Sequence, residues 1–113
     1  MKVVINSDYG GFSLSDKAVE RLFALKKWKL VKQDRDSGFT LYYKDYIGED
    51  SIFDERDLER DDLDLIRVVD ELGDDANGRF ASLSIVDIPD DVKWHISEVD
   101  GLEHVAEDHR TWY

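Results

Sequence analysis

The sequence has no cysteine and only one proline among its 113 residues. Without cysteine there can be no disulfide bonds, thiolate zinc sites or cysteine nucleophiles, which agrees with a reducing cytoplasm. A run of about 18 apolar residues, as a membrane helix needs, is also missing. The first residues, MKVVINSDYGG, turn polar too early for a secretory signal. We therefore expect a soluble, cytoplasmic protein with no membrane contact.

Basic residues are scarce. Lys and Arg number 15 against 27 Asp and Glu, which gives a formal charge of −12. Such a field repels nucleic-acid phosphates and anionic membranes, and it attracts basic protein surfaces. We expect no direct binding of DNA or RNA. An acidic surface can also serve solubility alone.

The apolar content is sufficient for a folded domain. Hydrophobic residues make up 42% of the chain and aromatic residues 12%, which distinguishes it from a disordered acidic chain. A chain of this length is usually one domain. We predict a single domain over residues 1–113.

Hydrophobic periodicity and capping residues predict the order of elements. Residues 47–59 are the least regular part and predict a loop or a short helical turn. The predicted elements are a strand over residues 2–5, a helix capped by Ser13 or Ser15, a hairpin of residues 29–32 and 39–43, a helix over 63–72, a hairpin of 80–88 and 92–96, and at most two helical turns over 102–107. This order indicates an α+β fold with a largely antiparallel sheet and two main helices packed on one face.

Negative charge is concentrated in residues 49–75. This stretch holds thirteen acidic residues and three arginines, and so carries ten of the twelve net negative charges. A row of carboxylates on a rigid body can resemble duplex phosphates and occupy a basic groove of a nucleic-acid-binding protein. A solvated acidic face is the simpler interpretation. The candidate partner-binding residues are Asp54, Glu55, Asp57, Glu59, Asp61, Asp62 and Asp64.

Gly10 and Gly11 form a second candidate feature, between the first predicted strand and the first predicted helix. Two adjacent glycines allow a tight turn or a close approach to a ligand. The loop lacks the Gly-x-Gly-x-x-Gly and Gly-Lys-Ser patterns of phosphate-binding loops. A plain turn is therefore the favoured interpretation.

The carboxyl-terminal segment contains the most metal-like group. His104 and Glu107 would lie one turn apart on a helix, with His109 close behind, and such side chains can converge on one cation. Arg110 and Trp112 could recognise a phosphate or a nucleobase. Exposed histidines, and a tryptophan that anchors the tail to the core, explain the same residues without a ligand.

No motif identifies a catalytic residue. The serines occupy cap or strand contexts, and none lies in a Gly-x-Ser-x-Gly elbow. With 27 acidic residues, any particular carboxylate pair is uninformative. We expect no enzymatic activity, no cofactor and no resident metal ion.

Three segments together resemble an uncharacterised family of small phage and bacterial proteins. They are Tyr-Gly-Gly-Phe-x-Leu-Ser at residues 9–15, Val-Val-x-Glu-Leu-Gly at 68–73, and Ile-Pro-Asp-Asp-Val-x-Trp at 88–94 followed by Asp-Gly at 100–101 and His-Arg-x-Trp at 109–112. Residues 28–48 and 49–59 do not match. The resemblance implies a phage-type accessory protein in the host cytoplasm and transfers no catalytic residue.

Three functional hypotheses follow. The first is an acidic binding protein that inhibits a host or defence protein by occupying a basic, nucleic-acid-binding site. The alternative is a small metal- or nucleotide-binding module, hydrolytic in one version. Its candidate ligand-binding residues are Gly10, Gly11, His104, Glu107, His109, Arg110 and Trp112. The third is a structural protein of a phage particle.

Overall fold

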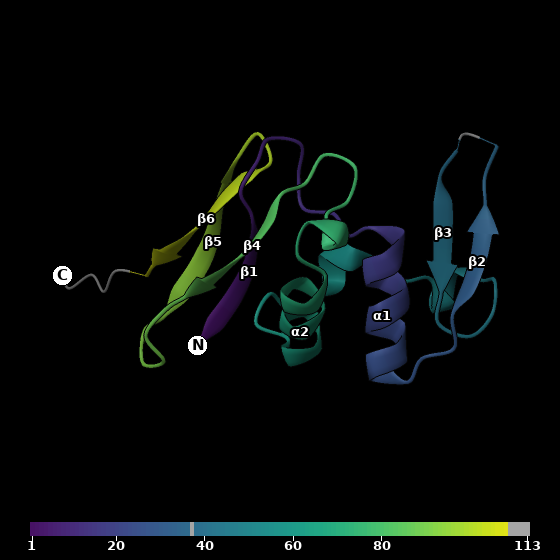
Figure 1. The fold of residues 1–113 in the computed structure, drawn as a ribbon, viewed down its shortest axis with the longest axis horizontal. Helices are drawn as coiled ribbons and strands as arrows, with labels where there is room; N and C mark the ends of the chain where they lie inside the picture. The colour runs from purple at the N-terminus through teal and green to yellow at the C-terminus, as the bar shows by residue number, and fades with distance from the viewer. Residues whose placement is uncertain (37, 109–113) are drawn as a thin grey trace.

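The computed structural model describes residues 1–36 and 38–108 (Figure 1). Within these residues all strand pairs are antiparallel, and two α-helices accompany them, so the α+β prediction is confirmed. No helix in these residues is long and apolar enough to cross a bilayer. The elements are β1 (Lys2–Asn6), α1 (Asp16–Lys26), β2 (Val31–Asp34), β3 (Thr40–Tyr43), η1 (Glu49–Ser51), η2 (Glu55–Asp57), α2 (Leu63–Leu72), η3 (Gly73–Ala76), β4 (Leu83–Asp87), β5 (Trp94–Val99) and β6 (Leu102–Glu107).

Helix α1 begins and ends at residues suited to these positions. The hydroxyl of Ser15 accepts a hydrogen bond from the Ala18 N–H at 3.1 Å, so Ser15 is the N-cap that the sequence offered beside Ser13. The helix ends at Lys27, which adopts a left-handed conformation with φ 58°. Its apolar stripe is buried in the core and consists of Ala18, Val19, Leu22 and Phe23.

Helix α2 has the bounds that its sequence predicts. The carboxylate of Asp62 accepts hydrogen bonds from the N–H groups of Asp64 and Leu65, at 2.8 and 3.1 Å. The helix gives way at Gly73, whose φ is 56°. Leu65 is fully buried and shares one core cluster with α1, so the two helices pack together.

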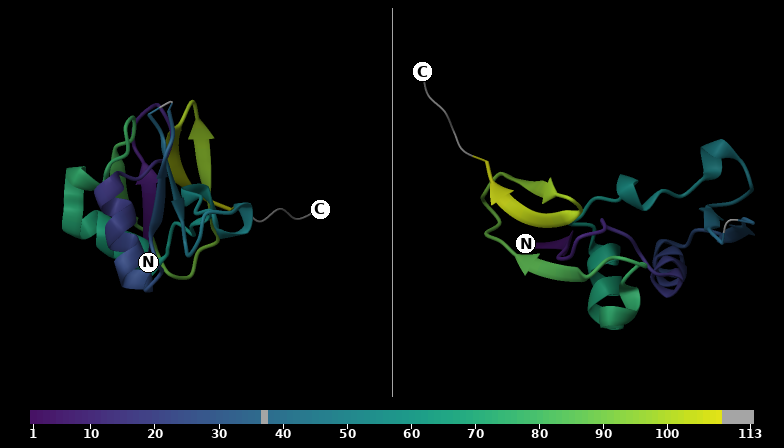
Figure 2. Two further views of the ribbon diagram at one scale, coloured as in Figure 1. Left: turned by 90° about the vertical axis from the view of Figure 1, so that its right-hand side faces the viewer. Right: turned by 90° about the horizontal axis from the view of Figure 1, so that it is seen from above.

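The strands form three separate antiparallel pairs. Strand β1 pairs with β4, β2 with β3, and β5 with β6. The pair β2–β3 lies on the far side of α1 from β1 and β4, whereas β5 and β6 lie beyond β1 (Figures 1 and 2). The helices are therefore flanked by strands on two sides.

Two predictions about the carboxyl-terminal half are wrong. Strand β4 does not form a hairpin with the next strand, because it pairs with β1 at the other end of the chain. Residues 102–107 form strand β6 and not a helix. Asp100 and Gly101 have φ values of 52° and 88°, and positive φ at both central residues is typical of the two-residue turn that joins hairpin strands.

An ion pair fills the space between β1 and β6. The guanidinium of Arg60 binds both carboxylate oxygens of Glu103, at 2.6 and 2.9 Å, and only 7% of the Glu103 side chain is exposed. The same carboxylate accepts the Asn6 N–H at 2.8 Å, and the Arg60 carbonyl accepts the Val4 N–H at 2.8 Å. Strand β6 is not hydrogen-bonded to β1 as a neighbouring strand. The N–H groups of Val4 and Asn6 on this edge of β1 therefore find their acceptors in Arg60 and Glu103.

The β2–β3 hairpin is attached to α1 through an aromatic cluster. The rings of Trp28 and Phe53 each pack edge-on against Phe23, with centroid distances of 5.4 and 5.1 Å. Strands β2 and β3 pair antiparallel, so the predicted hairpin of residues 29–32 and 39–43 is confirmed, with its first strand two residues later than expected. Residues 47–59 contain the short turns η1 and η2, as expected.

Candidate functional site

The structure does not bring His104 and Glu107 together on one face. His104 and Glu107 lie on strand β6, where residues three apart point to opposite faces. The helical geometry that would have aimed both at one cation is therefore wrong. Among the residues that the structure describes, no cluster of three or more metal-ligating side chains is found. His109, Arg110 and Trp112 lie outside the described residues.

Gly10 and Gly11 meet the Asp100–Gly101 turn. The Gly10 N–H donates to the Asp100 carbonyl at 3.3 Å, and the Asn6 side-chain amide donates to the Gly101 carbonyl at 2.7 Å. A Cβ on Gly101 would lie 2.7 Å from the Gly10 nitrogen. These glycines allow two backbones to approach closely, which supports the plain-turn interpretation.

Four of the seven acidic candidates are occupied by interactions within the protein. Asp62 caps α2 and binds the Lys26 ammonium at 2.6 Å, and Asp64 binds the same ammonium at 3.1 Å. Asp54 pairs with the Arg56 guanidinium at 2.7 Å. Hydrogen bonds from the Arg56 side chain and backbone lower the pKa of Asp54.

Glu55, the fourth of these acids, is half-buried and binds a backbone N–H group instead of a cation. Its carboxylate accepts the Leu14 N–H at 2.9 Å. Burial nevertheless raises the pKa of Glu55, since removal from water disfavours the charged form. The proximity of Asp54 acts in the same direction.

The other three candidates extend toward solvent. Asp57 and Glu59 are exposed and Asp61 is half-buried. In the described part of the chain, no hydrogen bond or ion pair from these three side chains is found. The structure therefore divides the predicted row of seven acids into four with internal partners and three facing water.

We call residues 45–61 the acidic connector, because they link β3 to the start of α2 and contain eight acids and two arginines. Both arginines are already paired, Arg56 with Asp54 and Arg60 with Glu103. Further exposed acids near the start of the connector lie outside the predicted row of seven. They are Asp45, Glu49 and Asp50. The structure shows that the neighbouring side chains of Tyr46 and Ile47 are exposed as well.

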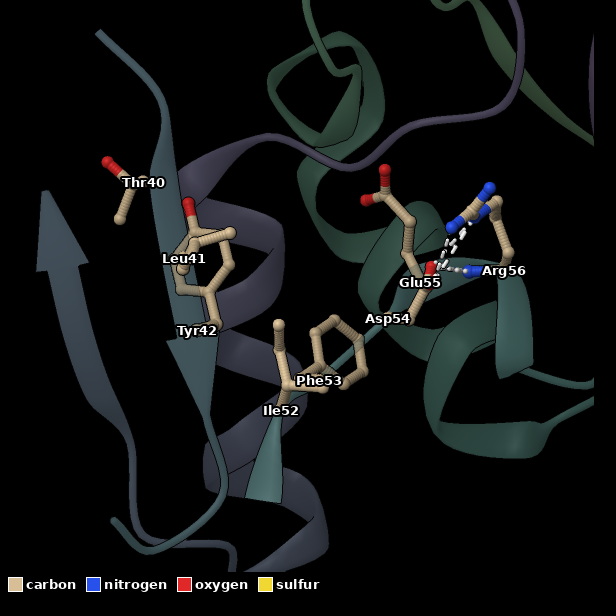
Figure 3. Close-up of a pocket in the computed structure, with 8 residues that line it drawn as sticks. All are labelled: Thr40, Leu41, Tyr42, Ile52, Phe53, Asp54, Glu55 and Arg56. Atoms are coloured by element: carbon tan, nitrogen blue, oxygen red, sulfur yellow. Dashed lines mark hydrogen bonds and ion pairs between the residues drawn. The ribbon is translucent and has the colours of Figure 1, made fainter. Parts of the chain in front are cut away.

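A pocket of about 320 Å³ lies between β3 and the acidic connector (Figure 3). One wall is strand β3, the opposite wall carries the acids and Arg56, and Ile52 and Phe53 lie between the two walls. The lining residues are Thr40, Leu41, Tyr42, Ile52, Phe53, Asp54, Glu55 and Arg56. In the sequence these residues belong to two separate predicted elements, and no local pattern predicts that they meet.

The polar side chains of this pocket have partners within the protein. The hydroxyl of Thr40 donates to Asp34 at 2.9 Å, and the hydroxyl of Tyr42 donates to Asp16 at 2.7 Å. Burial and the bond to Asp16 raise the pKa of Tyr42, so this phenol stays protonated. The remaining polar groups of the lining are the strand backbone, the Asp54 and Glu55 carboxylates and the Arg56 guanidinium.

Comparison with known proteins gives no relative. No family model, no curated protein and no solved structure matches the chain. The resemblance to a family of small phage and bacterial proteins therefore stays a prediction. The function has to be argued from the site itself.

Proposed function

We propose that this chain is a non-enzymatic binding protein whose acidic connector docks on a basic surface of a partner protein. The observation that carries the proposal is that both arginines of the connector are already in ion pairs. Arg56 and Arg60 are each paired with a carboxylate, so they cannot neutralise the exposed acids around them. The exposed acids are Asp45, Glu49, Asp50, Asp57 and Glu59.

The connector also presents these acids on an anchored backbone. The Phe53 N–H donates to the Tyr42 carbonyl at 2.8 Å, and the Phe53 side chain is buried. Further along, the Arg60 carbonyl binds Val4. A surface held in place before binding loses less conformational entropy on association.

The partner in this proposal is a host or defence protein with a nucleic-acid-binding groove, and the chain is a phage-type inhibitor in the host cytoplasm. The net charge of −12 supports a basic target, because carboxylates can stand in for phosphates there and long-range attraction speeds encounter. The resemblance of three segments to small phage and bacterial proteins supports the phage-type role in this proposal.

Charge reversal tests the proposal. In a variant with Glu49→Lys, Asp57→Lys and Glu59→Lys, we expect capture of the partner from bacterial lysate to be lost, because exposed negative charge is reversed without breaking an internal hydrogen bond. Tagged protein would be washed at low and then high salt, and bound proteins identified by mass spectrometry.

The matched control changes the net charge equally at another place. Asp74, Asp75 and Asp91 are exposed, so their replacement by lysine makes the same change outside the connector. If this control still captures the partner and the connector variant does not, the result supports the proposal. Equal capture by both variants contradicts it.

A further inference from the structure

We infer that the outer edge of β3 is a strand-addition site, at which an extended basic segment of the partner pairs with Thr40 and Tyr42. The inference rests on the proposed function and specifies how the partner is held. Strand addition supplies affinity through main-chain hydrogen bonds and specificity through alternate side chains.

The direction of the backbone groups of β3 identifies the open edge. The Phe39 carbonyl accepts the Arg35 N–H at 2.7 Å and so points toward the β2 side of the hairpin. The Tyr42 carbonyl accepts the Phe53 N–H and so points away from β2. Because these groups alternate along a strand, the N–H groups of Thr40 and Tyr42 point to the outer side.

The acidic connector covers only part of this edge. It is bound at the Lys44 N–H, which donates to the Ser51 carbonyl at 2.8 Å, and at the Tyr42 carbonyl. After Phe53 the chain turns away into η2. No hydrogen bond in residues 1–36 and 38–108 reaches the N–H of Thr40 or Tyr42, and the pocket begins here.

The charges around the pocket select a basic occupant. Glu55 lies across the pocket from β3 (Figure 3), and Asp16 binds the Tyr42 hydroxyl from the side of α1. Glu55 and Glu20 are also close enough to contribute to the raised pKa of Tyr42. Two cations are also present, since Lys32 binds Asp16 and Glu20, and Arg56 binds Asp54. The four carboxylates of Asp16, Glu20, Asp54 and Glu55 still outnumber these two cations, so lysine or arginine side chains on an added strand would meet a net negative charge.

The same charges disfavour a second copy of this chain. Pairing of two β3 edges would bring the acidic walls of both copies together, and like charges in close contact are destabilising. An extended segment of opposite charge has no such penalty. We therefore assign the edge to a basic partner segment.

The probe is a short peptide in which lysine and valine alternate, with both ends blocked. In Thr40→Pro the outward N–H is removed, whereas the ladder to β2 is kept because Thr40 does not donate to β2. Thr40→Val is the matched control, since it also loses the hydroxyl bond to Asp34 but keeps the N–H. Affinities and amide chemical shifts would be measured by NMR titration.

We expect peptide-induced shifts at Thr40 and Tyr42 in the natural protein. The Thr40→Pro variant should bind roughly tenfold more weakly than Thr40→Val, the effect of one lost hydrogen bond. A backbone N-methylated peptide should show a similar loss with the natural protein, a comparison that does not depend on the folding of either variant.

The inference is overturned if the peptide does not bind, if the shifts lie elsewhere, or if N-methylation has no effect. Shifts at Thr40 and Tyr42 that grow with protein concentration alone would assign the edge to a second copy and also overturn it. If the peptide experiment fails in one of these ways but connector charge reversal still abolishes partner capture, then strand addition is wrong and the proposed function stands. If charge reversal leaves capture intact, the proposed function fails as well.

Discussion

Glu55 is a charged residue in an unfavourable place. Its carboxylate binds the Leu14 N–H, yet burial raises its pKa. A raised carboxyl pKa means that the folded state tolerates the charge less well than the unfolded state does, so the charge costs stability. Such costs are typical of residues retained for binding.

Replacement of Glu55 by glutamine should stabilise the protein at neutral pH, because the amide oxygen can still accept the Leu14 N–H. The cost of the buried charge is fully present above the folded pKa, and it disappears as the pH falls below the unfolded value of 4.5. The advantage of the variant should therefore shrink in acid. Thermal unfolding across this pH range measures it, with the exposed Glu59→Gln as control. A variant less stable than the natural protein at neutral pH would contradict this account.

Among the elements, the β5–β6 hairpin is closed by a two-residue turn at Asp100 and Gly101. Gly101 has φ 88°, and its backbone lies against the Gly10–Gly11 loop. The turn therefore joins two strands and also holds the loop that precedes α1. A side chain at this position would disturb both contacts.

Replacement of Gly101 by alanine should cost about 3 kcal/mol or more of unfolding free energy, since the left-handed conformation and the collision with Gly10 act together. Gly38 is the matched control, because its φ is 85° but no atom lies within 4 Å of an added Cβ. Its replacement by alanine should cost about 1 kcal/mol. Urea unfolding compares the two, and equal losses would show that the loop contact contributes nothing.

At the scale of the whole molecule, Arg60 and Glu103 connect three parts of the chain. They link the acidic connector, β1 and β6, and the Arg60 guanidinium also lies 3.6 Å from the centre of the Phe12 ring. An ion pair with so little exposure is sensitive to the loss of one partner, because the remaining charge is left without compensation.

Replacement of Glu103 by alanine should therefore cost about 3–5 kcal/mol. It leaves the Arg60 charge and the Asn6 N–H without their acceptor. In the double variant Arg60→Met, Glu103→Leu the loss should be smaller than the sum of the losses in the single variants Arg60→Met and Glu103→Leu, since no lone charge is buried. Urea unfolding of the single and double variants checks this, and additive losses would argue against a coupled pair.

Local signals predicted much of the fold. Ser15 and Asp62 are residues that cap helices, and they precede apolar stripes of helical period. The Asp100–Gly101 pair predicts a turn, and this turn joins two strands, so the predicted helical turns over 102–107 are wrong. That error also placed His104 and Glu107 on one face.

By itself, the sequence determined the helices, the β2–β3 hairpin and the excess of negative charge, because these depend on residues close together in the chain. Only the tertiary structure decided that β4 pairs with β1, and that the carboxylates of Glu55 and Glu103 bind Leu14 and Arg60. Those choices depend on how distant segments pack. The same packing decided which acids remain exposed on the acidic connector and which edge of β3 stays open.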